Sequence, residues 1–105
     1  MRIVIADDEP VALARLELAL AQVDDARVAG KAKTGAEAAA MIRKLKPDIA
    51  VLDVQMPAGD GFSILTDLDS VTHIPEVIFV TAHHDYALRA FEVGAVDYLL
   101  KPVAL

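Results

Sequence analysis

Short apolar segments alternate with longer amphipathic segments along this chain of 105 residues. Residues 2–6 are apolar and rich in β-branched side chains without polar alternation, a pattern typical of a strand buried on both faces. Similar runs predict strands at residues 49–52, 77–80 and 96–100, and the more polar segment 26–33 predicts an edge strand. The pattern therefore predicts five strands separated by helical segments.

The first two predicted helices have recognisable starts and ends. Glu9-Pro10 opens the first helix, because a carboxylate and a proline both suit a first turn. Thr34 and Glu37 form a predicted capping box at the start of the second helix, which Pro47 ends. Helical spacing predicts the core face of the first helix: Leu13, Leu16, Leu20 and Val23.

Two further helices are predicted between the later strands. The third begins after Gly61 and turns its apolar side chains inward: Phe62, Leu65 and Leu68. The fourth spans about residues 85–93 and ends at Gly94, a typical C-terminal cap. Its Leu88 and Phe91 belong either to the core or to a dimer face, and we expect one of the two in the core.

Strands that alternate with helices predict an α/β fold with a parallel sheet and right-handed crossovers. A sheet covered on both faces requires a further helix after the fifth strand, but only Val103-Ala104-Leu105 follow Pro102. We therefore expect residues 1–105 to be one domain that is truncated before or within helix five. The face left bare is expected to favour self-association.

Polar side chains follow the predicted strands at the points where these end. Asp7 and Asp8 follow the first strand, Asp53 the third, Thr81 the fourth and Lys101 the fifth. In open parallel sheets, ligands bind beyond the carboxyl ends of the strands. These carboxylates, the hydroxyl and the ammonium group are therefore predicted to share one pocket.

The predicted pocket suits a divalent metal and a phosphoryl group. Clustered carboxylates repel one another unless a cation lies between them, and ligands that are all oxygen favour Mg²⁺ or Mn²⁺ over zinc. Asp53 is predicted to be the nucleophile in phosphoryl transfer, with Asp7, Asp8 and the Gln55 backbone carbonyl also holding the metal. Lys101 and Thr81 are expected to bind oxygens of the transferred group.

Composition narrows the possible functions. The net charge of -6 argues against nucleic-acid binding by this chain itself, because phosphate-backbone affinity needs clustered Lys and Arg. No apolar run approaches the about 20 residues that span a bilayer, and we see no signal peptide. Cysteine is absent, which excludes disulfides and thiolate metal sites. These features fit a cytoplasmic protein.

The order and content of the motifs resemble a response-regulator receiver domain of bacterial two-component signalling. The matching pieces, which cover the whole chain, are Asp7-Asp8-Glu9-Pro10, Leu52-Asp53-Val54-Gln55-Met56-Pro57, Asp60-Gly61, Val80-Thr81-Ala82 and Tyr98-Leu99-Leu100-Lys101-Pro102. The stretch from Phe79 to Tyr98 is similar to receivers of the LytTR class, whose members usually carry a C-terminal DNA-binding domain.

This resemblance implies a flavodoxin-like, doubly wound five-stranded sheet of order 2-1-3-4-5. It implies that Asp53 accepts phosphate from a sensor histidine kinase with Mg²⁺, that Thr81 then moves towards the phosphate, and that Tyr98 turns inward. The face of helix four, strand five and helix five would change, and homodimerisation would use helix four and strand five. DNA would be bound only by an attached domain. A cis bond between Lys101 and Pro102 is also implied.

Other interpretations remain open. Gln55 and His83, two residues beyond Asp53 and Thr81, flank the predicted pocket mouth and are candidates for tuning the lifetime of the acyl phosphate. Adjacent His83 and His84 are a poor metal site, because neighbouring residues rarely converge on one ion. The rival functions are a stand-alone receiver or adaptor, and a metal-dependent aspartyl phosphohydrolase. The adjacent Asp7 and Asp8 do not match the aspartate spacing of such hydrolases.

Overall fold

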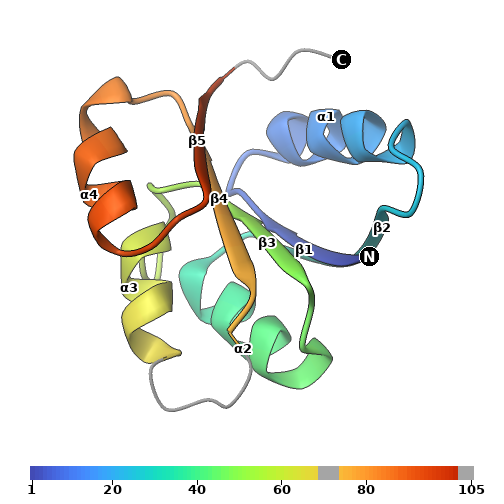
Figure 1. Cartoon of the computed structure of the whole chain (residues 1–105), viewed down its shortest axis with the longest axis horizontal. Coiled ribbons are helices and arrows are strands. Elements are labelled where there is room, and N and C mark those ends of the chain that lie inside the picture. Colours follow the sequence, from blue (N-terminus) through green and yellow to red (C-terminus); the bar gives the residue numbers. More distant parts are fainter. Residues whose placement is uncertain (69–73, 102–105) are drawn as a thin grey trace.

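A five-stranded parallel sheet forms the centre of the molecule (Figure 1). The computed structural model describes residues 1–68 and 74–101. The strands are β1 (Arg2–Ala6), β2 (Arg27–Ala32), β3 (Ile49–Leu52), β4 (Glu76–Thr81) and β5 (Asp97–Leu100). Their order, β2-β1-β3-β4-β5, confirms the predicted flavodoxin-like topology and the position of β2 at an edge. The expected cis bond at Pro102 and any start of helix five lie outside the described residues.

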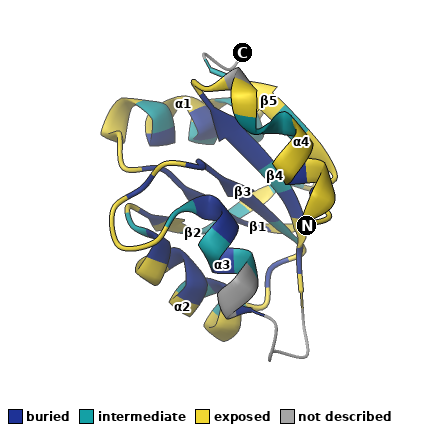
Figure 2. Ribbon diagram, turned by 90° about the vertical axis from the view of Figure 1, so that its left-hand side faces the viewer, coloured by how far each residue is buried: buried dark blue, intermediate teal, exposed yellow. Residues whose placement is uncertain are grey.

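The described helices are α1 (Pro10–Ala21), α2 (Gly35–Leu45), α3 (Gly61–Asp67), the 3₁₀ turn η1 (His84–Tyr86) and α4 (Ala87–Glu92). Figures 1 and 2 show α1 on one face of the sheet and α2 and α3 on the other. The N-terminus of α2 is capped as predicted, because the Thr34 hydroxyl accepts a hydrogen bond from the Glu37 backbone N–H at 3.1 Å. Helix α2 ends at Leu45, just before Pro47, as its sequence requires.

The alternation of side chains along β1 divides the core into two layers. Ile3 and Ile5 pack with Leu13 and Leu16 of α1. Val4 and Ala6 point the opposite way and pack in the larger layer that α2, α3 and α4 cover. Residues 3–6 are at most 1% exposed, which confirms that β1 is buried on both faces. The central strands are therefore rigid supports for the loops at their carboxyl ends.

Two predictions about helix faces are wrong. Val23 is 49% exposed, because α1 ends at Ala21 and the helical periodicity stops before it reaches this residue. On α4, both Leu88 and Phe91 are exposed, at 73% and 60%. The short helix turns Ala90 inward instead, and Phe91 is rotated away by about 100° from this buried neighbour.

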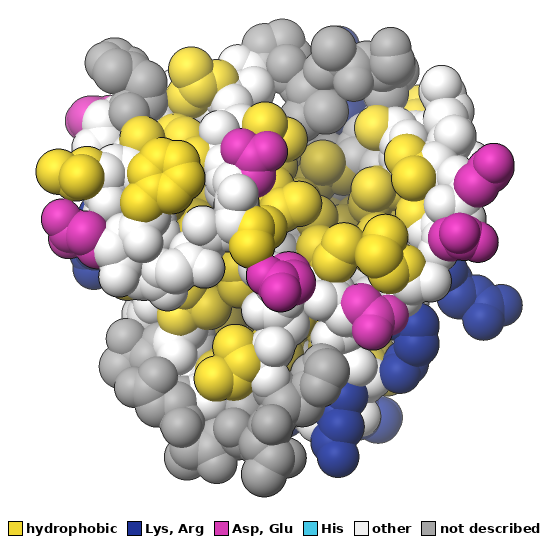
Figure 3. Space-filling view, viewed as in Figure 1, with side chains coloured by type: hydrophobic (Ala, Val, Ile, Leu, Met, Phe, Trp, Pro, Cys, Tyr) yellow, Lys and Arg dark blue, Asp and Glu magenta, His cyan; other side chains and the backbone are white. Residues whose placement is uncertain are grey.

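Apolar side chains remain at the surface of the described structure. Figure 3 shows hydrophobic side chains gathered between α1 and β5, and others over α4. The exposed side chains of β5 include Leu99 and Leu100, at 41% and 51%. Among the described residues, no helix is both long enough and apolar enough to cross a lipid bilayer.

Helix α2 also supports the loop that follows β3. The backbone N–H groups of Gly35 and Ala36 lie in the first turn, where a helix offers them no partner of its own. They donate instead to the carbonyl oxygens of Pro57 and Ala58, at 3.1 and 2.9 Å. This close approach requires glycine at position 35, since a Cβ atom there would lie 1.9 Å from the Gly59 carbonyl oxygen. The start of α2 thus fixes a loop that reaches the carboxyl edge of the sheet.

Replacing Gly35 by alanine should therefore destabilise the protein. We expect Gly35→Ala to lower the free energy of unfolding by about 2–3 kcal/mol, because backbone must move to relieve the clash. Urea denaturation measures this loss. Gly30→Ala is the matched control, because its closest contacts would be the flexible ends of Leu45 and Met41 at 3.1 Å, with Val4 at an ordinary 3.8 Å. Equal losses in the two variants would contradict the proposed contact.

Candidate functional site

The hydrogen-bond ladder of the sheet continues one residue beyond the ends of three strands. The backbone N–H of Asp53 donates to Ala6 at 2.9 Å, and that of Lys101 donates to Thr81 at 2.8 Å. In the same way Asp7 donates to Ala32 of β2 at 3.0 Å. The polar residues that follow the strands are therefore held in register with the sheet at one edge, as parallel pairing predicts.

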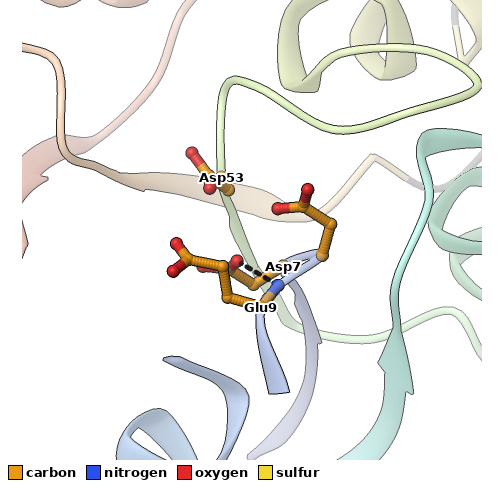
Figure 4. A group of neighbouring side chains, drawn as sticks. Asp7, Glu9 and Asp53 are labelled. Atoms are coloured by element: carbon orange, nitrogen blue, oxygen red, sulfur yellow. Dashed lines mark hydrogen bonds between the residues drawn. The ribbon is translucent and has the colours of Figure 1, made fainter. Parts of the chain in front are cut away.

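Four carboxylates meet at this edge. One oxygen from each of Asp7, Asp8, Glu9 and Asp53 lies within 4.8 Å of the others. Asp7 is fully buried and Asp53 is 5% exposed, whereas Asp8 and Glu9 are exposed. Figure 4 shows the side chains of Asp7 and Glu9, from the end of β1, beside Asp53 at the end of β3. The predicted convergence of Asp7, Asp8 and Asp53 is thus present in the structure.

Lys101 joins these acids. Its Nζ lies 2.7 Å from Asp7 Oδ2, 3.0 Å from Asp53 Oδ2 and 3.0 Å from Glu9 Oε1. The lysine side chain is 15% exposed, so its pairs with Asp7 and Asp53 are shielded from water. Ion pairs of this kind are strongly destabilising to break, since they leave a buried charge behind. Lys101 therefore offsets part of the repulsion between these carboxylates.

Short side-chain turns fix the orientation of three site residues. Asp7 Oδ1 accepts from the Glu9 N–H at 2.9 Å, the hydrogen bond drawn in Figure 4. Asp53 Oδ1 accepts from Gln55 N–H, and Thr81 Oγ1 from His83 N–H, each at 3.3 Å. Such bonds between a side chain and the backbone two residues on are typical of Asx and ST turns. They hold the side chains at the strand ends before any ligand binds.

A glycine allows α3 to begin directly against the site. A Cβ atom on Gly61 would lie 2.6 Å from the Asp53 carbonyl oxygen and 2.9 Å from the Phe79 ring. Asp60, just before it, caps α3 by accepting from the Ser63 N–H at 2.7 Å. The motif Asp60-Gly61 thus holds the helix close to Asp53, and the Asp60 carboxylate is engaged elsewhere.

The electrostatics of the cluster shift two ionisation equilibria. Burial raises the pKa of Asp7 and the neighbouring Asp53 adds to this, against the lowering effects of Lys101 and the Glu9 backbone. Burial alone lowers the pKa of Lys101, but its close contacts with the carboxylates of Asp7, Asp53 and Glu9 outweigh that effect and raise it. Lys101 is therefore positively charged at neutral pH, whereas ionising Asp7 carries a penalty in the folded protein.

The residues present fit a divalent cation. No well-oriented hydrogen bond reaches the buried Asp7 Oδ2, although the Lys101 ammonium lies beside it. The potential ligands that the described residues bring together are all carboxylates, which suits Mg²⁺ or Mn²⁺. His83 is not among them. The role of the Gln55 carbonyl as a further ligand stays a prediction.

A cleft of about 510 Å³ opens over Asp53. The residues that line it come from four loops: Asp8, Glu9, Asp53, Gln55, Met56, Pro57, Asp60, Thr81, Ala82, His83 and Lys101. Gln55 and His83 both lie along this cleft, as their spacing from Asp53 and Thr81 suggests. A phosphoryl group on Asp53 would thus face solvent on one side and Lys101 on the other.

Two tyrosines contact the residues beside the cleft. The Tyr98 hydroxyl donates to the backbone carbonyl oxygen of His83. Burial raises the pKa of Tyr98, so this hydroxyl keeps its proton at neutral pH. Gln55 Nε2 donates to the Tyr86 hydroxyl at 3.1 Å. Tyr98, the predicted switch residue, is thus connected to the site through the loop after β4.

The sequence did not single out Glu9 and Tyr86 as site residues. The sequence predicts Glu9 at the opening of α1, yet its carboxylate makes no cap hydrogen bond and instead pairs with Lys101 at 3.0 Å. Its position directly after Asp8 was the available signal. Tyr86 carries no comparable signal, because its contact with Gln55 depends on how the 3₁₀ turn η1 places the ring.

The comparison with protein families agrees with this geometry. A family model described as the response regulator receiver domain matches residues 3–105. The chain belongs to this family. It is therefore the receiver domain of a two-component response regulator, as the sequence motifs indicated.

Curated relatives resemble the whole chain but are longer. The "Positive alginate biosynthesis regulatory protein" of Pseudomonas aeruginosa is 47% identical over 104 residues, which are 98% of this chain and 42% of that protein. The "Transcriptional regulatory protein BtsR" of Salmonella typhi is 42% identical over 103 residues, 98% of this chain and 43% of that protein. This receiver thus spans about two fifths of these relatives.

Solved receiver structures share the fold. The response regulatory domain of mrkE from Klebsiella pneumoniae has a TM-score of 0.90 at 29% identity, covering 99% of this chain and 85% of that one. The signal receiver domain of the putative response regulator NarL from Mycobacterium tuberculosis gives 0.89 at 31% identity, covering 98% and 85%. The receiver architecture is thus preserved while most residues differ.

Removing the Lys101 ammonium should expose the repulsion between the acids. At neutral pH and with a metal chelator present, we expect Lys101→Met to lower the free energy of unfolding by about 2–3 kcal/mol. Mg²⁺ should restore part of this loss by replacing the missing charge. Acidification should also reduce it, because the raised pKa of Asp7 lets the folded protein take up a proton at higher pH than the unfolded chain does.

Thermal and urea unfolding with and without Mg²⁺ measure these effects. Lys31→Met is the matched control, since Lys31 pairs with Glu17 at an exposed position and should contribute less than about 1 kcal/mol. A loss in Lys101→Met that neither Mg²⁺ nor acid reduces would contradict the electrostatic origin.

Proposed function

We propose that Asp53 accepts a phosphoryl group from the phosphohistidine of a sensor histidine kinase. The observation that carries this proposal is the position of the Asp53 carboxylate, 3.0 Å from Lys101 and at the base of an open cleft. Asp7, Asp8 and Glu9 lie beside it. An aspartate in such surroundings combines a nucleophile with the positive charge that phosphoryl transfer requires.

The transfer is an in-line displacement. A carboxylate oxygen of Asp53 attacks phosphorus, the bond from phosphorus to the kinase imidazole breaks, and its electron pair returns to the ring. Lys101 compensates the negative charge on the phosphoryl oxygens. Thr81 Oγ1 accepts from the His83 N–H, so its own proton is free to donate to one of those oxygens. The protein contributes mainly by positioning and electrostatics.

A divalent cation, Mg²⁺ or Mn²⁺, would be held by Asp7, Asp8, Asp53 and the Gln55 backbone carbonyl. When bound, it would neutralise negative charge on the phosphoryl oxygens and the carboxylates. The single ammonium group of Lys101 contacts three carboxylates. The site therefore keeps an excess of negative charge that a further cation would offset. This imbalance supports the metal requirement.

Thr81 and Tyr98 are proposed to transmit the change. Both contact His83, since Thr81 Oγ1 accepts its N–H and the Tyr98 hydroxyl donates to its carbonyl. A shift of Thr81 towards a phosphoryl group would therefore disturb the same residue that holds Tyr98. The consequence would be a changed surface on α4 and β5. In this role the chain acts as a signalling switch that assists its own phosphorylation and dephosphorylation, and not as an enzyme with a free substrate.

We further propose that this receiver belongs to a transcription regulator of the LytTR class. The support comes from the similar stretch Phe79 to Tyr98 and from the relatives named as regulatory proteins. DNA would then be bound by an attached C-terminal domain, because the chain itself has a net charge of -6. A stand-alone adaptor is the alternative.

The exposed side chains on α4 and β5 support a proposed homodimer. Leu88, Phe91, Val93, Leu99 and Leu100 are all more than 40% exposed. Apolar patches of this kind often mark protein interaction sites. We place the dimer contact on this face because it is also the surface that Thr81 and Tyr98 would alter.

Phosphorylation can be tested by intact-protein mass spectrometry. With a small acyl phosphate and Mg²⁺, we expect a mass gain of one phosphoryl group, and none in Asp53→Asn. Asp60→Asn is the control and should still be phosphorylated, because Asp60 lines the cleft but caps α3. An unchanged gain in Asp53→Asn would overturn the proposal, and rapid multiple turnover of phosphate esters would favour the phosphohydrolase.

Dimerisation can be tested by sedimentation. We expect association to increase with phosphorylation and to fall at least about tenfold in Phe91→Glu, because the charge would be buried at the contact. Leu18 lies on α1 and is 57% exposed, so Leu18→Glu is the control and should leave association unchanged. A strictly monomeric profile at high concentration, or equal effects of both variants, would count against this face.

A further inference from the structure

The side chain of Gln55 reaches across one side of the cleft. Gln55 belongs to the loop after β3, whereas Tyr86 is the last residue of η1, on the segment after β4. The Gln55 amide Nε2 donates to the Tyr86 hydroxyl at 3.1 Å. This hydrogen bond therefore connects the loop that carries Asp53 to the segment after β4, and it does so beside the cleft that Gln55 lines.

Tyr86 is the more firmly held of the two partners. Its ring packs edge-on against Phe62 at 5.9 Å between centroids and against His83 at 6.0 Å. Phe62 is 3% exposed and packs in turn on the fully buried Phe79 at 4.9 Å. Gln55, by contrast, is exposed, and its long side chain has several rotatable bonds. The tyrosine therefore positions the glutamine, because only the tyrosine is anchored in the core.

We propose that Tyr86 is a positioning residue that holds Gln55 across the cleft mouth and thereby limits the access of water to phosphorylated Asp53. The inference rests on the proposed phospho-acceptor function. Hydrolysis requires that a water oxygen attack phosphorus, that the bond from phosphorus to the Asp53 oxygen break, and that its electron pair return to the carboxylate. The proton of the water leaves to the released phosphate or to solvent.

The direction of attack connects this chemistry to Gln55. Asp53 is 5% exposed and its Oδ2 lies 3.0 Å from Lys101 Nζ, so solvent reaches its carboxylate through the cleft. Gln55, Met56, Pro57, Ala82 and His83 are among the residues that line this cleft. A Gln55 side chain tied to Tyr86 covers part of that approach. Without the tyrosine hydroxyl the amide is free to adopt other rotamers, and the approach opens.

The variant Tyr86→Phe tests the proposal, because it keeps the aromatic packing and removes only the hydroxyl. We expect the aspartyl phosphate to hydrolyse about three- to tenfold faster, the factor expected from losing one neutral hydrogen bond. Gln55→Ala should show a similar acceleration. In the double variant the two effects should not multiply, since each change removes the same contact.

The measurement is the loss of phosphoryl mass from the protein after the acyl phosphate donor and Mg²⁺ have been removed. Arg89→Gln is the matched control, because it removes the guanidinium that lies 4.4 Å from the centre of the Phe62 ring, which Tyr86 also contacts, and it leaves both partners of the Gln55–Tyr86 hydrogen bond in place. Its hydrolysis rate should equal that of the parent. Thermal unfolding of all variants identifies any change in hydrolysis rate that comes from a general loss of stability.

An unchanged or slower hydrolysis in Tyr86→Phe, multiplying effects in the double variant, or equal acceleration in Arg89→Gln would each overturn the proposal. The nuclear magnetic resonance signals of the Gln55 side-chain amide provide a readout independent of phosphate, and they should shift in Tyr86→Phe but not in Arg89→Gln. If those signals shift as expected but no aspartyl phosphate forms on the parent protein, the proposed function has failed. If phosphate forms and its lifetime is unchanged, only the role of Tyr86 has failed.

Discussion

The ammonium group of Lys101 is the contact on which the site depends. Two almost fully buried carboxylates, Asp7 and Asp53, lie within ion-pair distance of it, at 2.7 and 3.0 Å. In a medium of low dielectric constant, ionised acids this close repel each other strongly unless a cation lies beside them. The parallel sheet brings the acids together, and Lys101 from the last strand makes that proximity stable. The chemistry of the site therefore follows from negative charge that Lys101 neutralises only in part.

This incomplete neutralisation supports the proposed role of the site in phosphoryl transfer. The carboxylates outnumber the positive charge at Lys101, so the cluster attracts a further cation. A phosphoryl group on Asp53 adds more negative charge and changes the balance again. Thr81, His83 and Tyr98 are hydrogen-bonded in sequence beside the cleft, which supports the proposal that a change at the site is transmitted to β5.

Much of this arrangement could be predicted from residue patterns. The unbroken apolar runs of β1 and β3 predict buried parallel strands, and parallel strands place Asp7, Asp53 and Lys101 at one edge. That reasoning needs only the period of the side chains and the direction of the chain. It failed where the length of a helix decides orientation: α1 ends before Val23, and the short α4 turns Leu88 and Phe91 outward.

Contacts between loops could not be predicted in the same way. The pairing of Glu9 with Lys101 and the hydrogen bond of Gln55 with Tyr86 join residues that are 92 and 31 positions apart in the chain. Neither follows from periodicity, because loop geometry and rotamers set both. The Gly35 contact with Gly59 is of the same kind, since its need for glycine is visible only when the backbones meet.

The most direct test of this account is a crystal structure of the protein grown with Mn²⁺, with the metal located by its anomalous scattering. We expect a single manganese peak bound by carboxylate oxygens of Asp7, Asp8 and Asp53 and by the Gln55 backbone carbonyl, with the Lys101 ammonium still beside Asp53. Side chains of Asp7, Asp8 and Asp53 that point apart, or a manganese ion bound only elsewhere on the molecule, would contradict it.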